Sequence, residues 1–137
     1  MHQSKEIKRE ELIARAIEAR EHAYAPYSNY KVGAAVQTEN GHVFAGCNVE
    51  NAVYPLGLCA ERVAIFKAVS EGAKHIAALA VATSNGGTPC GSCRQVLREF
   101  SNLETPIFIA KPDGTHREFT LNDLLPESFS SADLDAV

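Results

Sequence analysis

Two segments indicate both the fold and the chemistry of this chain: Cys59-Ala60-Glu61-Arg62 and Pro89-Cys90-Gly91-Ser92-Cys93-Arg94. Together they offer three thiols, the number of protein ligands that a catalytic zinc site uses, with a carboxylate beside the first. Zinc held by three ligands keeps a fourth position for water and lowers the pKa of that water to about 7. The sequence therefore predicts an open, water-activating Zn²⁺ site with Cys59, Cys90 and Cys93 as ligands.

Each segment is predicted to begin a helix. The apolar spacing indicates one helix from about Cys59 to Glu71, which Gly72 can cap, and another from Cys90 or Gly91 to Phe100. Unpaired backbone N–H groups and the positive end of the dipole stabilise thiolates at such positions. We therefore expect the metal to lie between two helix N-termini.

The rest of the chain alternates helices and strands. The elements expected are an amphipathic helix from Glu6 to about Tyr24, strands at 31–37 and 42–47 joined by Asn40-Gly41, buried strands at 76–83 and 106–111, an edge strand at 116–119, and a short helix starting within 120–123. This order predicts an α/β fold, a three-layer α/β/α sandwich around a mixed five-stranded sheet, with residues 1–137 forming a single domain.

Composition narrows the function classes. Thirteen Lys and Arg against seventeen Asp and Glu give a net charge of -4, and no basic run appears, so a nucleic acid polymer is a poor ligand. No apolar stretch approaches the roughly 20 residues that span a bilayer, and the segment from Met1 to Glu6 lacks a signal peptide's apolar run. We expect a cytoplasmic protein without membrane contact, in which cysteines serve as metal ligands or free thiols.

Three charged residues flank the thiols. On a helix, Glu61 points about 200 degrees around from Cys59, so it can move protons beside the metal instead of binding it. The alternative is a solvent-facing glutamate stabilised by the helix dipole. Arg62 and Arg94 each follow a ligand segment, and we expect both to hydrogen-bond to ligand sulfurs and offset the negative charge of three thiolates.

The pattern of Cys or His, any residue, Glu, then Pro-Cys-x-x-Cys resembles that of the zinc-dependent nucleobase deaminases. With cysteine as first ligand, the chain looks like the small homotetrameric cytidine deaminases along nearly its whole length. The segments that carry this resemblance are Ala25-Pro26-Tyr27-Ser28, 31–35, 46–52, 59–62 and Leu124-Leu125-Pro126. The resemblance implies hydrolysis of cytidine and 2'-deoxycytidine to the uridine products with release of ammonia, one zinc per subunit, and pyrimidine salvage.

The resemblance also implies roles for residues. Glu61 would protonate N3 and then the departing amino group, while Asn48 and Glu50, two apart in extended chain, would hold the ribose 3'-hydroxyl. Tyr30 stands where the family often has Phe and would pack against the pyrimidine; Phe129 would complete a neighbouring subunit's site. From the residues alone, both rings suit ordinary packing equally well. Further candidates on the substrate side or at a subunit boundary are Ala52, Tyr54 and Ala60.

Other interpretations remain open at this point. If Cys47 joined the three thiols, a closed four-cysteine site would make the zinc structural and the protein a binding module. Alternatively, Cys90 and Cys93 at a helix start resemble a redox dithiol. Among enzymes, the runner-up is a deaminase of another cytosine nucleoside, such as a blasticidin-type antibiotic. The simplest expectation for Cys47 is a buried strand thiol, and the five histidines show no ligand spacing.

Overall fold

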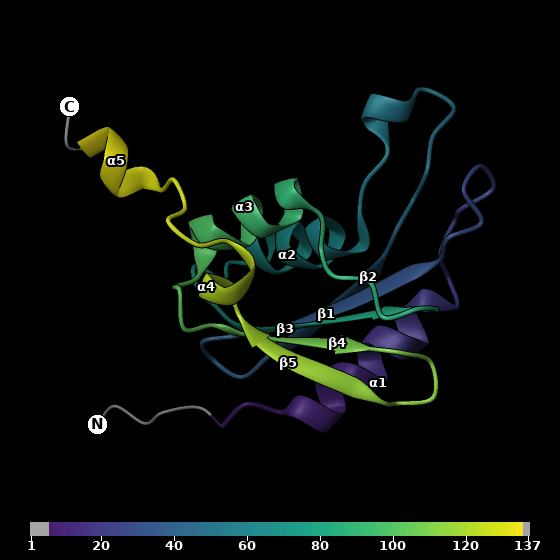
Figure 1. Ribbon diagram of the computed structural model, residues 1–137, viewed down its shortest axis with the longest axis horizontal. Coiled ribbons are helices and arrows are strands. Elements are labelled where there is room, and N and C mark those ends of the chain that lie inside the picture. Colours follow the sequence, from purple (N-terminus) through teal and green to yellow (C-terminus); the bar gives the residue numbers. More distant parts are fainter. Residues whose placement is uncertain (1–5, 136–137) are drawn as a thin grey trace.

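A five-stranded sheet forms the centre of the protein, for which a computed structural model describes residues 6–135. The strand order is β2-β1-β3-β4-β5, and only β3 and β4 run parallel (Figure 1). The strands are β1 (Val32–Thr38), β2 (Val43–Cys47), β3 (Ile76–Thr83), β4 (Pro106–Ala110) and β5 (His116–Thr120). The predicted mixed sheet is confirmed.

Helices cover both faces of this sheet. Helix α1 (Arg9–Arg20) lies on one face, and α2 (Ala60–Ser70) and α3 (Gly91–Phe100) lie on the other (Figure 1). The shorter helices are the 3-10 helix η1 (Tyr54–Leu56), α4 (Leu121–Leu124) and α5 (Ser131–Asp135). The predicted three-layer arrangement is confirmed. In the described part of the chain, none of the helices is long and apolar enough to cross a membrane.

The two layers of core follow from alternation along the strands. On β1, Ala34 and Val36 belong to the cluster beneath α2 and α3, while Ala35 belongs to the cluster beneath α1. Gly33 permits α1 to approach closely, because a Cβ atom there would lie 1.9 Å from the carbonyl oxygen of Ala16. Small residues on β1 thus set the distance between the sheet and α1.

Helix α1 is shorter than predicted at both ends, since it begins at Arg9 and ends at Arg20. The residues after it leave the helix because Tyr24 pairs with the segment that follows β2. The backbone N–H of Tyr24 donates to the backbone carbonyl oxygen of Asn48 at 3.0 Å, and the backbone N–H of Glu50 donates to the backbone carbonyl oxygen of Tyr24 at 2.8 Å. This pairing draws the 24–30 loop towards the chain that leads to Cys59.

The hairpin turn also differs in detail from the expectation. Gly41 has a φ of 84°, and its N–H donates to the Thr38 oxygen at 2.9 Å. Asn40 is not among the described residues with positive φ, so Gly41 alone supplies the left-handed conformation. Three residues therefore connect β1 to the chain at His42, instead of the two of a tight Asn-Gly turn.

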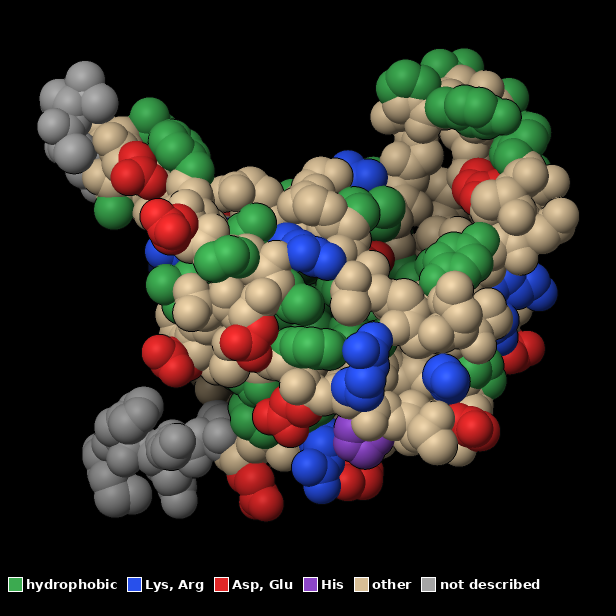
Figure 2. All heavy atoms as spheres, in the orientation of Figure 1, with side chains coloured by type: hydrophobic (Ala, Val, Ile, Leu, Met, Phe, Trp, Pro, Cys, Tyr) green, Lys and Arg blue, Asp and Glu red, His purple; other side chains and the backbone are tan. Residues whose placement is uncertain are grey.

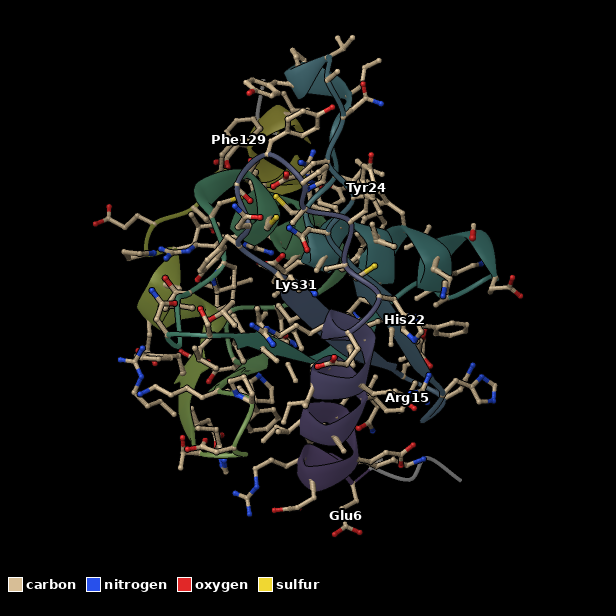
Figure 3. The ribbon with its side chains drawn as sticks, turned by 90° about the vertical axis from the view of Figure 1, so that its right-hand side faces the viewer. Glu6, Arg15, His22, Tyr24, Lys31 and Phe129 are labelled. Carbon is tan, nitrogen blue, oxygen red and sulfur yellow. The ribbon has the colours of Figure 1, made fainter. Side chains whose placement is uncertain are left out.

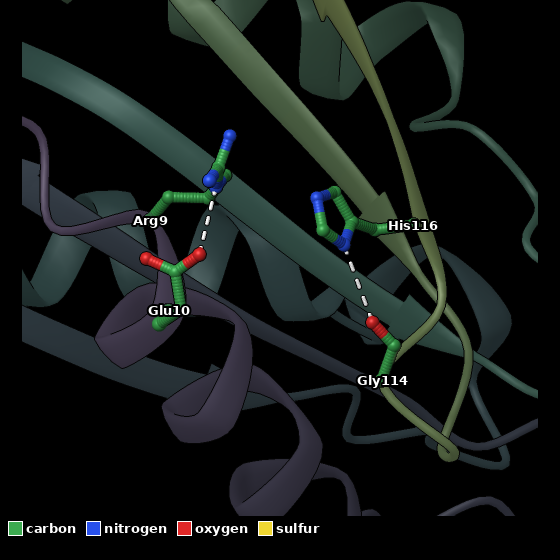
Figure 4. A network of polar contacts seen from close by, with 4 residues as sticks. All are labelled: Arg9, Glu10, Gly114 and His116. Carbon is green, nitrogen blue, oxygen red and sulfur yellow. Dashed lines mark hydrogen bonds and ion pairs between the residues drawn. The ribbon is translucent and has the colours of Figure 1, made fainter.

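Figure 4 shows two exposed polar contacts, one at the start of α1 and one at the turn between β4 and β5. Arg9 Nε lies 3.0 Å from a carboxylate oxygen of Glu10, and His116 Nδ1 lies 3.2 Å from the Gly114 oxygen. Gly114 closes the β4–β5 turn with a φ of 91°.

Candidate metal centre and substrate pocket

The sulfur atoms of Cys59, Cys90 and Cys93 all lie within 4.8 Å of one another. The Cys59 and Cys90 sulfurs are 3.9 Å apart, and those of Cys90 and Cys93 are 3.3 Å apart. Tetrahedral coordination with Zn–S bonds of about 2.3 Å puts sulfurs about 3.8 Å apart, so the cluster fits a zinc ion after a small adjustment. Cys47 is not part of the cluster, which contradicts the closed four-cysteine alternative.

Two helix starts bring the thiols together. Cys59 is the residue immediately before α2, Cys90 is the residue immediately before α3, and both have extended backbone conformations. Cys93 lies in the first turn of α3 and is buried. The thiols are thus at the positive ends of two helix dipoles, as the sequence predicts.

The environments of Cys59 and Cys93 shift the pKa values of these two thiols in opposite directions. Hydrogen bonds from the Cys93 thiol and the Arg62 guanidinium lower the pKa of Cys59 to about 5, against the effect of burial. The same hydrogen bond to Cys59, together with burial, raises the pKa of Cys93 well above its usual range. These contacts favour the thiolate at Cys59 and the protonated thiol at Cys93, and metal binding requires the loss of that proton.

The two arginines behave differently. Arg62 Nη2 lies 3.6 Å from the Cys59 sulfur, and its Nε is buried without a hydrogen-bond partner among the described residues. The guanidinium of Arg94 instead donates to the Pro89 oxygen at 2.7 Å, the Leu124 oxygen at 2.6 Å and Thr88 Oγ1 at 2.8 Å. The expected contact from Arg94 to a sulfur is therefore wrong. Arg94 instead stabilises the loop before Cys90, because its guanidinium donors are hydrogen-bonded to these three oxygens and not to a sulfur.

Glu61 is buried on the first turn of α2, with 4% of its surface exposed. Burial raises the pKa of Glu61 to about 7, and the negative charge of Cys59 adds to this effect. A bound dication would favour the charged form again. The solvent-facing alternative for Glu61 is wrong, because the residue is buried and lines a cavity together with Cys59 and Cys90.

This cavity has a volume of about 430 Å³. Nine predicted site residues line it: Tyr30, Asn48, Glu50, Tyr54, Cys59, Ala60, Glu61, Arg62 and Cys90. Ser28, Thr83 and Thr88 line it as well. Sequence reasoning missed Thr83 and Thr88, since no motif or spacing marks them, and it gave Ser28 no site role although Ser28 lies in one of the segments that carry the family resemblance. The fold thus joins a metal centre, a buried carboxyl and a polar rim in one pocket.

Asn48 uses its side chain to hold the chain that enters β1. Its Nδ2 donates to the backbone carbonyl oxygen of Tyr30 and its Oδ1 accepts from the backbone N–H of Val32, both at 2.9 Å. One N–H and one lone pair of this amide have no partner in these contacts. Asn48 is therefore oriented by the protein, with hydrogen-bonding capacity left for a ligand.

Glu50 caps the turn that precedes Tyr30. Its Oε1 accepts from the N–H groups of Tyr27 and Ser28 at 2.9 and 3.1 Å, and its Oε2 accepts from the Ser28 hydroxyl. The Ser28 hydroxyl is the main reason that the pKa of Glu50 lies below its usual value. Glu50 is thus an oriented carboxylate on the pocket rim.

Three predicted site residues lie at the edges of the protomer. Tyr54 is 73% exposed on η1, and Ala52 is exposed just before it. Phe129 is 57% exposed on the yellow C-terminal segment, which Figure 1 shows at the opposite side from η1. Figure 3 labels Phe129 on this segment, where its backbone oxygen accepts from Gln95 Nε2 at 2.8 Å. Phe129 and Ala52 do not line the pocket of their own chain.

Comparisons with known proteins agree with this site. A family described as the cytidine and deoxycytidylate deaminase zinc-binding region matches residues 6–109. Over 127 residues, the chain is 48% identical to the cytidine deaminase of Sporosarcina psychrophila, covering 91% of this chain and 93% of the relative. It is 45% identical over 129 residues to that of Halalkalibacterium halodurans, covering 93% and 98%. The crystal structure of cytidine deaminase from Burkholderia pseudomallei superposes with a TM-score of 0.84 at 46% identity, covering 90% and 100%.

The fold and the site together define a class of protein: an α/β zinc protein whose three-cysteine centre opens onto a ligand pocket beside a buried carboxyl group. The matches extend over nearly the whole chain and include the metal centre. This chain belongs to the cytidine deaminase family.

Proposed function

We propose that this protein hydrolyses cytidine and 2'-deoxycytidine to uridine and 2'-deoxyuridine. Water replaces the exocyclic amine at C4 of the cytosine ring, and ammonia leaves. The observation that carries the proposal is the opening of the three-thiol cluster onto the same pocket as the buried carboxyl group of Glu61. Family membership supports the same reaction.

Zinc is the cofactor, and Cys59, Cys90 and Cys93 are its proposed ligands, one ion per subunit. When bound by three protein ligands, zinc lowers the pKa of a coordinated water to about 7 and so supplies a nucleophile at neutral pH. Three thiolates leave one excess negative charge on a divalent ion. The Arg62 guanidinium offsets this charge through its contact with the Cys59 sulfur.

Glu61 is the proposed proton carrier. It accepts a proton from water and donates it to N3 of the ring. It then accepts the second proton, from the hydroxyl group that has added to C4, and delivers it to the amino group, which leaves as ammonia. The burial that raises its pKa to about 7 suits both steps, because a group that titrates near the working pH can accept and donate with similar ease. General acid–base catalysis of this kind contributes roughly 100 to 10,000-fold.

Asn48 and Glu50 are the proposed ligands of the ribose 3'-hydroxyl. Each is held by the 27–32 segment, and each keeps free hydrogen-bonding capacity on the pocket side. Glu50 is ionised at neutral pH, because its pKa lies below the usual glutamate value. A phosphate group near it would be repelled, which favours a nucleoside over a nucleotide.

We also propose that the working form is a homotetramer in which neighbours complete each site. The projecting segment around η1 carries exposed apolar side chains, among them Val53, Tyr54 and Leu56 (Figure 2). An exposed apolar surface of this kind is typical of a protein interface. In this arrangement Tyr30 and Ala60 contact the base within the subunit, whereas Ala52 and Tyr54 lie at a boundary and Phe129 serves a neighbour.

The setting that we propose is pyrimidine salvage in the cytoplasm, by a chain that forms one domain over residues 1–137. The small apolar-and-polar pocket suits a free nucleoside, and the net charge of -4 disfavours a polynucleotide partner. The segment Met1–Lys5, on which part of the expected location depends, lies outside the described residues.

One experiment tests reaction and substrate together. The purified, zinc-loaded protein is incubated with cytidine, 2'-deoxycytidine, cytosine or cytidine monophosphate while the ultraviolet spectrum and ammonia are followed. We expect both nucleosides to be converted, with little reaction of the free base or the nucleotide. If neither nucleoside were converted, the proposed reaction would be overturned. Comparable activity on the monophosphate would overturn the proposed preference for a nucleoside over a nucleotide.

A further inference from the structure

A hydrogen bond joins two loops that border the pocket from different parts of the chain. The Tyr30 hydroxyl donates to Asn85 Oδ1 at 2.7 Å, across 55 residues of sequence. Tyr30 stands just before β1, and Asn85 lies in the loop that leaves β3 and ends at the ligand Cys90. The contact therefore links the substrate side of the pocket to the loop that carries a metal ligand.

The orientation of the Asn85 side chain follows from its other partners. Asn85 Oδ1 also accepts from the Gly87 N–H at 3.2 Å, while Thr83 Oγ1 accepts from the same N–H at 2.8 Å. A backbone N–H can only donate, so the atom that faces it must be the amide oxygen. Asn85 is thus the acceptor on which the loop closes.

Tyr30 touches the backbone of this loop directly. A Cβ atom at Gly87 would lie 2.6 Å from the Tyr30 hydroxyl oxygen, so no side chain fits there without movement. Tyr30, Gly87 and Cys90 all line the same cavity. The hydroxyl group therefore packs against the loop three residues before the ligand.

The other end of Tyr30 is anchored as well. The backbone N–H of Tyr30 donates to Ser28 Oγ at 3.0 Å, and the backbone carbonyl oxygen of Tyr30 accepts from Asn48 Nδ2 at 2.9 Å. Ser28 in turn bonds to Glu50. A continuous set of hydrogen bonds therefore runs from the proposed ribose ligands through Tyr30 to the loop of Cys90.

We propose that Tyr30 and Asn85 are positioning residues that latch the 84–90 loop against the substrate-binding segment. The phenol hydroxyl, which a phenylalanine would lack, fixes the angle of the ring at the pocket and restrains the approach of Cys90 to the metal. The kinetic part of this inference rests on the proposed function; the restraint of the metal-ligand loop does not.

The test uses the full chain with zinc bound. Tyr30→Phe removes only the hydroxyl, Asn85→Ala removes the acceptor, and Asn85→Asp keeps an oxygen at the same place. Tyr24→Phe is the matched control, because the exposed Tyr24 side chain makes no hydrogen bond within the described residues. For each variant and for the Tyr30→Phe/Asn85→Ala double variant, we would measure KM and kcat for cytidine and the rate of zinc transfer to a chromophoric chelator.

We expect Tyr30→Phe and Asn85→Ala each to raise KM by about 3- to 10-fold and to speed zinc release by a similar factor, with kcat nearly unchanged. In the double variant, KM and the rate of zinc release should be no higher than in the more impaired of the two single variants. In Asn85→Asp, both should stay near the values of the unmodified protein. Effects that multiply in the double variant, or unchanged KM and zinc release in both single variants, would overturn the latch. If the unmodified protein did not deaminate cytidine, the proposed function would be wrong. The rates of zinc release from the variants and the unmodified protein would still test the latch.

Discussion

The Nη2 atom of Arg62 lies 3.6 Å from the sulfur of Cys59. Arg62 is on the first turn of α2, and Cys59 precedes it by three residues. The adjacent Nε of Arg62 is buried and has no partner within the described part of the chain. A buried nitrogen without a hydrogen-bond partner is costly, and the negative charge of the nearby Cys59 thiolate offsets this cost for the positively charged guanidinium. The geometry thus couples the charge of Arg62 to the state of the metal centre.

Arg62→Gln is expected to weaken zinc binding and lower turnover, by roughly 10 to 100-fold, because the Cys59 thiolate loses its charge partner. Zinc affinity from chelator competition and kcat for cytidine would measure both effects. Arg9→Gln is the control, since it removes only an exposed ion pair with Glu10. Unchanged affinity and turnover in Arg62→Gln would exclude the proposed charge compensation.

Glu61→Gln is expected to keep a full complement of zinc while kcat falls by at least about 100-fold, because the amide cannot carry protons. The replacement is nearly isosteric and leaves the three thiols in place. Metal analysis and turnover on the same sample provide the two readings. A near-normal rate would remove Glu61 from the mechanism.

Ser28→Ala is expected to shift the acid limb of the KM profile to higher pH. The Ser28 hydroxyl lowers the pKa of Glu50 below 4.5, so binding through the ionised carboxylate persists above that pKa and is lost as pH falls through it. Without the hydroxyl the pKa rises, and the loss of binding begins at less acid pH. KM for cytidine measured from neutral to acid pH would reveal the shift.

Ser70→Ala is the control for this experiment, because that hydroxyl bonds to the Lys67 oxygen near the end of α2, outside the pocket. Superimposable KM profiles for Ser28→Ala and the unmodified protein would contradict the assigned role of Ser28.

Phe129→Ala is expected to raise KM by about 3- to 10-fold with little change in assembly, if the ring stacks on a base in a neighbouring subunit. The ring is 57% exposed in its own chain, so its loss leaves no cavity in that chain's core. Kinetics and sedimentation would separate binding from assembly. Leu134→Ala, another exposed apolar change on the C-terminal segment, should leave KM as it is; an unaffected KM in Phe129→Ala would refute the stacking role.

Cys47→Ala is expected to retain zinc in full, whereas Cys93→Ala should lose most of it. Cys47 lies on β2 and takes no part in the thiol cluster. Zinc content after dialysis measures the difference. Loss of zinc from Cys47→Ala would reopen the possibility of a four-cysteine site.

Much of the fold was predictable, because its signals are local. Apolar periodicity and turn residues located all five strands and the three main helices, with errors of a few residues at the ends of α1. The paired helix starts at Cys59 and Cys90 were also predictable, since thiols and helix boundaries can both be read from adjacent residues. Helix α5 was not foreseen, and its five residues have little apolar pattern.

The sequence by itself indicated the three candidate ligands, the helix starts and the family, because each is marked by short motifs that can be read from adjacent residues. Only the tertiary structure decided which oxygens Arg94 meets, how deeply Glu61 is buried, and that Tyr30 bonds to Asn85. These features arise where α2, α3 and the loops around β1 and β3 converge. The partners are far apart in the chain, so their contacts depend on the order of strands in the sheet and carry no local signature.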